Sequence, residues 1–292
     1  MCLRGGARTI DGMRGRGKPV AICVGALGLA VLATATWFSW PHLRFWWLFE
    51  PLGPNAQGFP EYRHRQTGIV FVSLPGGKFW MGAQKMDPKG QNYDPEAQPN
   101  EGPVHEVTLS PFLIAKHEVT QGQWQRVMGT IPSQFEGADL PAESVCWEEC
   151  REFCRRAGLE FPTEAQWEYA CRGGTSACYA ETVKLEDMAW FVENSRDTTH
   201  PVGQKAGNGF GLHDMHGNVW EWCEDAFNEG FYRTPEAAEL DPVFTSGSDD
   251  RRVLRGGAFY LHRVSLRCAS RCELPYSRAH FIGFRVVASP PP

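Results

Sequence analysis

The chain has 292 residues, of which 42% are hydrophobic and 22% are charged, so it can bury a full core as one large domain or two smaller ones. Its formal net charge of -5 gives no broad basic field for holding a phosphate backbone, which makes nucleic acid a poor candidate partner. The chain has 11 Trp, 18 Phe, 31 Gly and 21 Pro, which predicts large buried aromatic anchors, many turns and few long helices.

Residues 19–40 carry no charged side chain. As a helix rising about 1.5 Å per residue they are long enough to cross a hydrocarbon core of about 30 Å. The preceding residues 1–18 are basic and predict a cytoplasmic N-terminus, with everything after residue 40 outside the cytoplasm. A second interpretation stays open, because the small residues 33–35 (ATA) offer a cleavage site for a signal peptide, which would give a secreted or periplasmic protein.

Residues 41–67 mix aromatic, proline and charged residues without a helical or strand period, which predicts a juxtamembrane linker. The folded domain is therefore expected at residues 68–288, followed by a tail at 289–292. Apolar residues alternate on both sides of the turn at 75–77 (PGG), which predicts a β-hairpin. Residues 104–120 predict two further short strands.

Three helices are predicted next along the chain. Thr120 is the expected N-cap of the first. The second is expected over residues 144–157 and ends at Gly158, the residue type favoured just beyond a helix C-terminus. The third begins at Thr163, which forms a capping box with Gln166. Short strands and long loops are expected after the third helix.

Several sequence blocks then suggest a family. The blocks LPGGKFWMG, PTEAQWEYACRGG, GNVWEW, RVLRGGAF and IGFRVV occur in this order. They resemble the signature blocks of the formylglycine-generating-enzyme, or sulfatase-modifying factor, family over nearly the whole chain after the apolar segment. The resemblance implies an α+β domain with a C-type-lectin-like fold, low regular secondary structure and bound calcium. Family members oxidise a sulfatase cysteine to formylglycine with oxygen and copper(I).

The resemblance also implies a calcium site in the segment DMHGNVWE. Its ligands would be the side chains of Asp214 and Glu221 and the backbone carbonyls of Gly217 and Val219, all oxygen donors of the kind a hard cation prefers. A glycine turn with solvated acids is the alternative. A second family calcium site maps to residues 189–194, where its side-chain ligand would fall on Trp190, so that site is expected to be altered or absent.

The family's catalytic cysteine pair is missing at the matching positions. The turn at 256–258 reads GGA, and Leu261 stands where the first cysteine is expected. The segment that follows, up to residue 267, is too short to supply the second. Copper(I) is a soft ion that prefers thiolates, so the family's reaction is not expected at this site.

Two downstream cysteines keep an alternative open. A register shift would bring Cys268 and Cys272 near the pocket, and the chain would then be a copper-dependent oxidase acting on a protein cysteine or another thiol. Against this, the resemblance implies that Cys268 is structural and pairs with Cys171 in a disulfide. It also leaves Cys154 as a free buried thiol. The spacing of Cys146, Cys150 and Cys154 on one helical face is compatible with a metal site, but such spacing is more often apolar packing.

Two C-terminal loops border the substrate cleft of the family. In this chain they are rich in aromatic and basic residues, which suit a binding surface, although ordinary packing is an alternative. We therefore expect an exported or membrane-anchored domain that binds an unknown protein or small-molecule ligand without formylglycine-generating activity. The candidate cleft residues are Phe259, Tyr260, Leu261, His262, Arg263, Tyr276, Arg278, His280 and Phe281.

Overall fold

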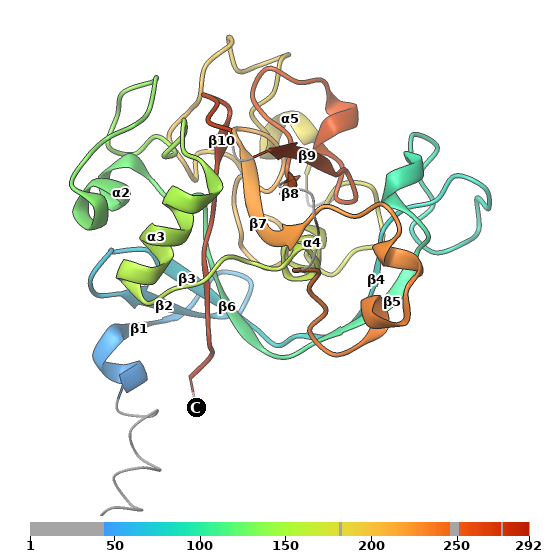
Figure 1. Ribbon diagram of the computed structural model, residues 1–292, viewed down its shortest axis with the longest axis horizontal. Helices are drawn as coiled ribbons and strands as arrows, with labels where there is room; N and C mark the ends of the chain where they lie inside the picture. The colour runs from blue at the N-terminus through green and yellow to red at the C-terminus, as the bar shows by residue number, and fades with distance from the viewer. Residues whose placement is uncertain (1–43, 181–182, 246–250, 276, 292) are drawn as a thin grey trace, which may run out of the picture. The chain divides into compact units, whose positions relative to one another are not determined.

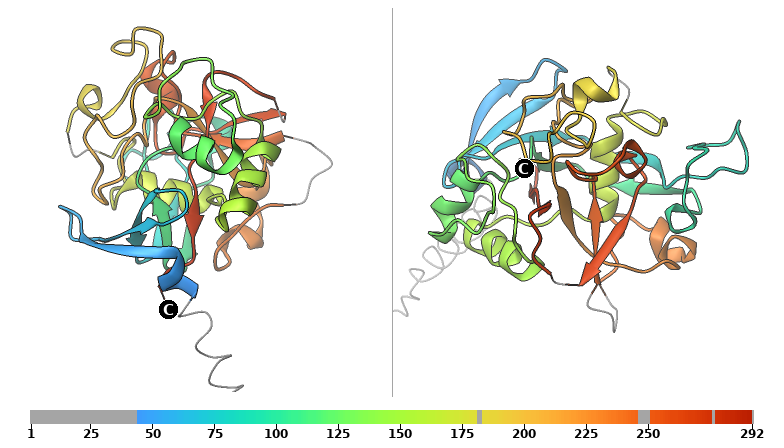
Figure 2. Two further views of the ribbon diagram at one scale, coloured as in Figure 1. Left: turned by 90° about the vertical axis from the view of Figure 1, so that its left-hand side faces the viewer. Right: turned by 90° about the horizontal axis from the view of Figure 1, so that it is seen from above.

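The computed structural model describes residues 44–180, 183–245, 251–275 and 277–291 (Figures 1 and 2). Contacts between residues divide the chain into one unit at Met1–Arg44 and another at Phe45–Pro292, and the second is described below. The predicted membrane segment at 19–40 lies outside the described residues. Among those that are described, no helix combines the length and the apolar character that a membrane crossing requires.

The first sheet has five strands in the order β1-β2-β3-β6-β11, and every neighbouring pair is antiparallel. Its centre is apolar because β3 and β6 place Phe71, Leu74, Leu113 and Ile114 in the core, each fully buried. The strands are β1 (Phe49–Pro54), β2 (Pro60–His64), β3 (Val70–Leu74), β6 (Phe112–Ala115) and β11 (Val287–Ala288).

The expectation of a juxtamembrane linker at 41–67 is wrong, because β1 and β2 lie within this segment. Phe49 anchors β1 in the core, where its ring stacks on Phe45 with centroids 4.8 Å apart and meets Phe71 edge to face at 5.5 Å. The strand period is hard to read in the sequence because the register of β1 shifts between Pro51 and Gly53. The folded domain thus begins well before residue 68.

The second sheet pairs β4 (Gly77–Met81) with β5 (His105–Leu109). The expected hairpin around the PGG turn is wrong, because β3 and β4 belong to different sheets. Gly76 explains the separation: its φ is +66°, and a Cβ at this residue would lie 2.3 Å from the carbonyl oxygen of Leu109. The turn thus packs against the end of β5 and directs β4 away from β3.

The third sheet has the order β10-β7-β8-β9 and holds the C-terminal signature blocks. The short strand β10 runs parallel to β7, whereas β7, β8 and β9 pair antiparallel. The strands are β7 (Trp220–Ala226), β8 (Arg251–Arg255), β9 (Cys272–Pro275) and β10 (Ile282–Gly283).

In the described part of the chain a helical segment at residues 44–48 precedes β1, and four further α-helices follow. They are α2 (Gln121–Met128), α3 (Trp147–Ala157), α4 (Glu164–Arg172) and α5 (Leu185–Met188). The short 3₁₀ helices are η1 (Pro99–Glu101), η2 (Phe231–Arg233), η3 (Pro235–Ala238) and η4 (Arg263–Leu266). In Figure 1, η2 and η3 lie beside the β4–β5 pair at one end of the unit, and η3 contacts β5.

The predicted helix boundaries are largely confirmed. Thr120 and Thr163 are the N-caps of α2 and α4, and each forms a capping box with the residue three positions on. Gly158 ends α3 in the left-handed conformation, with φ of +67°. The start of α3 is three residues later than predicted, because Ser144 has φ of +60° and Cys146 is the N-cap.

Candidate functional site

The sheet carrying the C-terminal blocks borders a cavity of about 660 Å³, which we call the C-terminal cleft. Tyr260 and Leu261, which follow β8, lie on its wall with Cys272 at the start of β9. Trp220 and the end of η1 also line it. The volume lies in the range of about 300–1,000 Å³ that is typical of small-molecule sites.

Two arginines that line the cleft are neutralised by buried carboxylates. Arg267 donates to Glu101 at 2.6 and 2.7 Å and to Asp94 at 2.8 Å. Arg271 makes a bidentate pair with Glu164 at 2.6 and 2.8 Å. These guanidinium groups therefore shape the cleft without giving it a net positive charge.

The predicted cleft residues separate into two groups. Tyr260 and Leu261 line the cavity. Phe259 is buried instead, and its ring meets Phe135 edge to face at 5.7 Å. His280 lies 6.0 Å from the Phe135 ring and 5.3 Å from the ring of Phe281. For Phe259 and His280 the packing interpretation therefore holds better than the binding one.

The remaining predicted cleft residues lie elsewhere on the unit. The His262 side chain is exposed, with Nδ1 3.4 Å from Glu193. The guanidinium of Arg263 lies 5.8 Å from the Tyr179 ring, and that of Arg278 pairs with Glu149 at 2.7 Å. None of these three is among the residues that line the cleft. Tyr276 lies outside the described residues.

The glycine turn fixes which side chains reach the cleft. Gly257 has φ of +78°, and a Cβ there would lie 2.9 Å from the carbonyl oxygen of Ser265, so only glycine fits. Ala258 follows it and is fully buried, and its carbonyl accepts the N–H of Leu261 at 3.0 Å. Leu261 thus faces the cavity where the family resemblance placed a catalytic cysteine.

Among the described residues that line the cleft, Cys272 supplies the one thiol. Burial, reinforced by the neighbouring charge of Glu273, raises the pKa of Cys272 to about 11. The group is therefore a neutral thiol near pH 7, and a neutral thiol is a poor nucleophile and a poor copper ligand. The cleft consequently contains neither a cysteine pair nor a ready thiolate.

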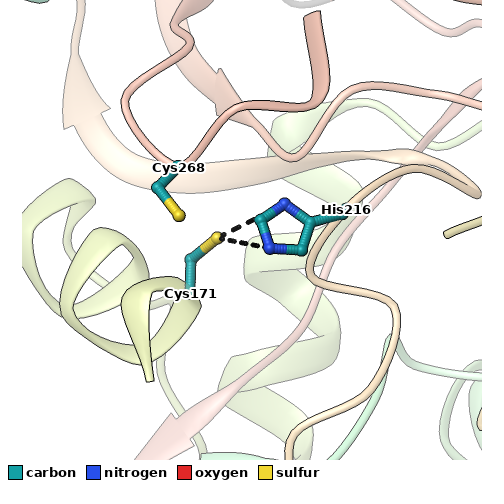
Figure 3. Close-up of side chains that lie close together, drawn as sticks. All are labelled: Cys171, His216 and Cys268. Atoms are coloured by element: carbon teal, nitrogen blue, oxygen red, sulfur yellow. Dashed lines mark hydrogen bonds between the residues drawn. The ribbon is translucent and has the colours of Figure 1, made fainter. Parts of the chain in front are cut away.

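A pair of neighbouring thiols lies in the core. Figure 3 shows the sulfurs of Cys171, on α4, and Cys268 pointing toward one another, with the ring of His216 beside Cys171. One sulfur or nitrogen atom from each of the three residues lies within 4.8 Å of the others. Both cysteines are free thiols in the structure, so the predicted disulfide is not formed there, although the two predicted partners are adjacent.

His216 is poorly placed to complete a metal site with these thiols. Its Nδ1 lies 2.7 Å from the carbonyl oxygen of Leu266, and its Nε2 accepts the N–H of Ala180 at 3.2 Å. The sulfur of Cys171 is nearly equidistant from the two nitrogens, at 3.9 and 3.8 Å, which places it beside the ring rather than along one lone pair. Burial lowers the pKa of His216 to about 4, so the ring is neutral.

The pKa values of the two thiols are shifted in opposite directions. Burial raises the pKa of Cys171 well above its ordinary value. Burial also opposes ionisation of Cys268, but the hydrogen bond from Cys171 and the charges of Arg172 and Arg255 leave its pKa below the ordinary value. Because Cys268 is fully buried and faces Cys171, the structure does not place its sulfur with that of Cys272 in the cleft.

Of the three cysteines at helical spacing, Cys150 and Cys154 pack into the core along one side of α3, whereas Cys146, the N-cap, is half-buried. Cys150 is fully buried and Cys154 is 4% exposed, both within the cluster around Phe153. Burial raises the pKa of Cys150 and Cys154 far above the ordinary thiol value. Among the described residues these cysteines do not meet in a group that could hold a metal ion, and their surroundings favour the packing interpretation.

The predicted calcium ligands lie beside a buried arginine. Both oxygens of Glu221 accept from Arg285 at 2.6 Å, and Oε2 also accepts from Trp167 at 2.8 Å. Oδ2 of Asp214 accepts the N–H of Gly203 at 2.7 Å. A carboxylate offers about four lone-pair positions, so Glu221 retains one on Oε1.

The charges around this point do not balance. Glu118, Asp214 and Glu221 are all buried, and the buried cation near them, Arg285, forms its ion pair with Glu221. Burial and the nearby carboxylates raise the pKa of Glu118 well above its ordinary value and also raise that of Asp214. If all three carboxyl groups are ionised, they exceed the one guanidinium by two negative charges, which a dication would compensate. On this ground the residues fit calcium, although their oxygens do not form a tight cluster.

The surroundings of Trp190 are unlike a calcium site. Its ring stacks on that of His200 with centroids 3.7 Å apart, and the ammonium of Lys205 lies 4.0 Å from the ring centroid. Lys205 is held there by a 2.6 Å bond to the carbonyl of Glu186. An ammonium would repel a metal ion and aromatic rings supply no oxygen ligand, and the alteration or absence of this site stays a prediction.

Sequence reasoning missed the arginines that organise the domain. Five buried arginines each pair with a buried carboxylate, and they connect α4, β8, η1, β7 and the C-terminal loops. Part of the signal was available, because Arg172, Arg255 and Arg285 lie inside the signature blocks, where neither strand nor helix period explains them. They are Arg172, Arg255, Arg267, Arg271 and Arg285.

Three small sheets joined by buried ion pairs, with the GNVWEW segment and a double-glycine turn beside one cleft, define a formylglycine-generating-type domain. The chain belongs to this family, since the sulfatase-modifying factor enzyme 1-like domain matches residues 56–290. This assignment confirms the resemblance and the α+β fold.

Three known proteins are similar to this chain in sequence or in fold. The chain is 30% identical to the formylglycine-generating enzyme of Streptomyces coelicolor, over 79% of this chain and 92% of that enzyme. It is 32% identical to the chaperone protein LppX of Paenibacillus barcinonensis, over 40% of this chain and 63% of LppX. The structure of PvdO from Pseudomonas aeruginosa has the same fold, with a TM-score of 0.68 and 24% identity over 79% of this chain and 98% of PvdO.

Proposed function

We propose that this domain is a binding module of the sulfatase-modifying factor family that has no formylglycine-generating activity. The observation that carries the proposal is the composition of the C-terminal cleft. The chemistry requires two thiolates, whereas the cleft offers Leu261 at the first cysteine position and, elsewhere in its lining, the neutral thiol of Cys272. Tyr260 and Trp220 supply aromatic surface there, and such surface binds ligands at low cost in conformational entropy.

The relatives support a role other than catalysis. The chain is similar to a protein named as a chaperone, LppX, as well as to formylglycine-generating enzymes. A shared domain in proteins with such different names is compatible with a scaffold whose function depends on its cleft residues. The ligand in this chain would be a protein segment or a small molecule that fills the cleft beside Tyr260 and Leu261.

The second candidate function is a thiol oxidase, and the presence of Cys272 in the cleft favours it. We expect the purified protein to bind copper(I) no more tightly than the Cys272→Ser variant, and to consume no oxygen with a cysteine-containing peptide. The physical reason is that one protonated thiol gives a soft metal too few ligands. Competition with a chelator that is specific for copper(I), together with an oxygen electrode, measures both quantities.

Copper-dependent oxygen consumption that disappears in Cys272→Ser would overturn the binding-module proposal. The control is Cys146→Ser, which removes a half-buried thiol at the start of α3 rather than one that lines the cleft. An equal loss of copper binding in both variants would indicate unspecific thiol chemistry rather than a site.

We also propose that the domain is held outside the cytoplasm by residues 19–40 or released there after cleavage. In that oxidising setting a disulfide between Cys171 and Cys268 is the expected state, since their sulfurs already face one another. Protein purified without reductant, denatured and alkylated should then gain two alkyl groups when reduction precedes alkylation. Cys171→Ser should abolish that gain, and an unchanged mass in the unsubstituted protein would contradict the disulfide.

Calcium is proposed as a structural ion. Asp214, Glu221 and the carbonyls of Gly217 and Val219 would hold it, and its charge would compensate the surplus of buried carboxylates. Its contribution would be to stability rather than to any reaction.

A further inference from the structure

The N-terminal end of the domain carries two exposed tryptophans. Trp46 is 44% exposed, and Trp47, at 76%, is the most exposed tryptophan in the described part of the chain. Large aromatic side chains are usually buried, and two of them together in solvent mark a surface that contacts another molecule. Neither residue lines the C-terminal cleft, so the function proposed for the cleft does not explain them.

The fold fixes these tryptophans to the outside of the domain. Phe45 and Phe49 lie four positions apart and are both buried, with ring centroids 4.8 Å apart, so one side of the helical segment 44–48 packs on the core. Trp46 and Trp47 come directly after Phe45 and are exposed on the other sides of the segment. The Trp46 ring also meets that of Phe45 edge to face at 5.1 Å. The exposed indoles are therefore attached to the core of the domain.

Basic side chains lie next to the two indoles. The backbone N–H of Arg65 donates to the carbonyl oxygen of Leu48 at 2.8 Å, which places the exposed Arg65 beside the end of the helical segment. The amide of the next residue along the chain donates to the carbonyl oxygen of Arg156 at 3.5 Å, and the Arg156 side chain is exposed as well. Tryptophan and arginine together are typical of surfaces at the boundary between membrane and water. We call Trp46, Trp47 and Arg65 the N-terminal face.

The chain itself brings a bilayer within reach of this face. Residues 41–44 are all that separates the apolar segment 19–40 from Phe45, which is fixed in the core. A chain spans at most about 3.6 Å per residue, so Phe45 lies within about 18 Å of the last residue of the apolar segment. The headgroup layer on each side of a bilayer is itself about 5–7 Å thick. With the segment in the membrane, as proposed above, the two indoles stay close to the headgroups.

We propose that the N-terminal face lies on the surface of a phospholipid bilayer, with the two indoles among the headgroups and Arg65 beside the lipid phosphates. An indole has an apolar body and a polar N–H, which suits the boundary between acyl chains and water. A guanidinium pairs readily with phosphate groups. The inference rests on the anchor proposed for residues 19–40 and not on the function proposed for the cleft.

This docking would set the orientation of the C-terminal cleft. In Figure 1 the helical segment, drawn in blue, lies at the opposite end of the unit from β9, whose first residue lines the cleft. The cleft would then lie on the side of the domain away from the membrane, where it meets ligands from the aqueous phase.

The test uses the full-length protein in nanodiscs of phosphatidylcholine and phosphatidylglycerol whose acyl chains carry bromine. Bromine quenches the emission of tryptophans that touch the lipid. The double variant Trp46→Phe, Trp47→Phe keeps two aromatic rings but removes both emitters. It should lose about half of the quenched emission, because Trp37 and Trp40 of the proposed anchor supply the other half.

The control is Trp80→Phe. Trp80 is 41% exposed, close to the value for Trp46, but it lies on β4. Its replacement should lower the total emission and leave the quenched emission unchanged. A loss of quenched emission in this variant equal to that in the double variant would overturn the proposal, because the domain would then touch the lipid in no fixed orientation.

Arg65 gives a second test. Arg65→Glu sets a negative charge against anionic headgroups, so it should lower the quenched emission in nanodiscs with phosphatidylglycerol but not in nanodiscs of phosphatidylcholine alone. Arg233→Glu makes the same change of charge on η2 and should leave the quenched emission unchanged. Equal effects of the two variants would count against the proposal, since they would reflect the net charge of the protein alone.

The outcomes separate this inference from the proposed anchor. Protein that an alkaline carbonate wash removes from vesicles would overturn the anchor and the docking with it. Protein that stays in the bilayer, with the same quenched emission in the double variant, would overturn the docking alone. A dimer in detergent that the double variant dissociates would assign the N-terminal face to a second copy of the chain and would also overturn the proposal.

Discussion

Replacing Arg255 with methionine is expected to lower the melting temperature by about 10 °C or to leave the domain unfolded. The guanidinium is fully buried, pairs with Glu168 and donates to the carbonyl oxygens of Cys268, Ala269 and Ser270. Breaking a buried ion pair by removing one partner costs about 3–5 kcal/mol. Each kcal/mol corresponds to about 2–4 °C in a domain of this size.

The matched control is Arg155→Met on the surface of α3. Arg155 also pairs with a glutamate, Glu152, at 2.7 Å, but its side chain is 72% exposed. Exposed pairs contribute little, so this variant should melt within about 2 °C of the unsubstituted protein. Differential scanning calorimetry compares the two. Equal melting temperatures for Arg255→Met and Arg155→Met would show that the buried arginine network does not hold the fold together.

Local features of the fold could be predicted from the sequence, whereas contacts between distant residues could not. The caps of α2 and α4 were predicted correctly, because a capping box involves residues three positions apart. Strand partners were predicted poorly. β3 pairs with β6 rather than with the nearby β4, and this depends on how the turn at Gly76 packs on Leu109, a residue 33 positions later.

The candidate site, too, could be predicted only in part from the sequence. The loss of the copper-binding cysteine pair could be inferred from the sequence alone, because a leucine at the first cysteine position cannot bind the metal. The cleft lining was predicted only in part. Phe259 and His280 lie in the predicted loops, yet they pack around Phe135 instead of facing the cavity. Arg267, which lines the cleft, meets Asp94 and Glu101 from more than 160 positions away, and such pairing has no local signature.

Removing calcium is expected to produce the second large effect, a fall of about 10 °C in the melting temperature. Calcium at about 1,000 times its dissociation constant would stabilise the native state by about 4 kcal/mol, and that converts to about 10 °C in a domain of this size. The reason is that Glu118, Asp214 and Glu221, when all are ionised, carry two negative charges more than Arg285 compensates, and calcium would supply the missing positive charge. Melting curves with added calcium and after extensive treatment with chelator measure the difference.

Two variants show whether the effect belongs to this site. Asp214→Asn removes one proposed ligand and should reduce the difference between calcium-loaded and calcium-free protein. Asp241→Asn is the control: Asp241 accepts from the backbone N–H and the hydroxyl of Ser110 at 2.7 and 2.6 Å, so this variant should melt lower while keeping the full calcium difference. An equal loss of the difference in both variants would place the calcium effect elsewhere.

The pH dependence gives an independent check. In calcium-free protein, burial and the nearby carboxylates raise the pKa values of Glu118 and Asp214 above those of the unfolded chain, so the native state binds more protons there. The contribution of these two groups to the stability of the calcium-free protein should therefore fall as pH rises above about 4, the range in which the unfolded carboxyls lose their protons first. Calcium displaces those protons, so the difference in melting temperature should widen with rising pH. A pH-independent difference, or no response to chelator, would favour the alternative of a glycine turn whose buried acids are neutralised by protons alone.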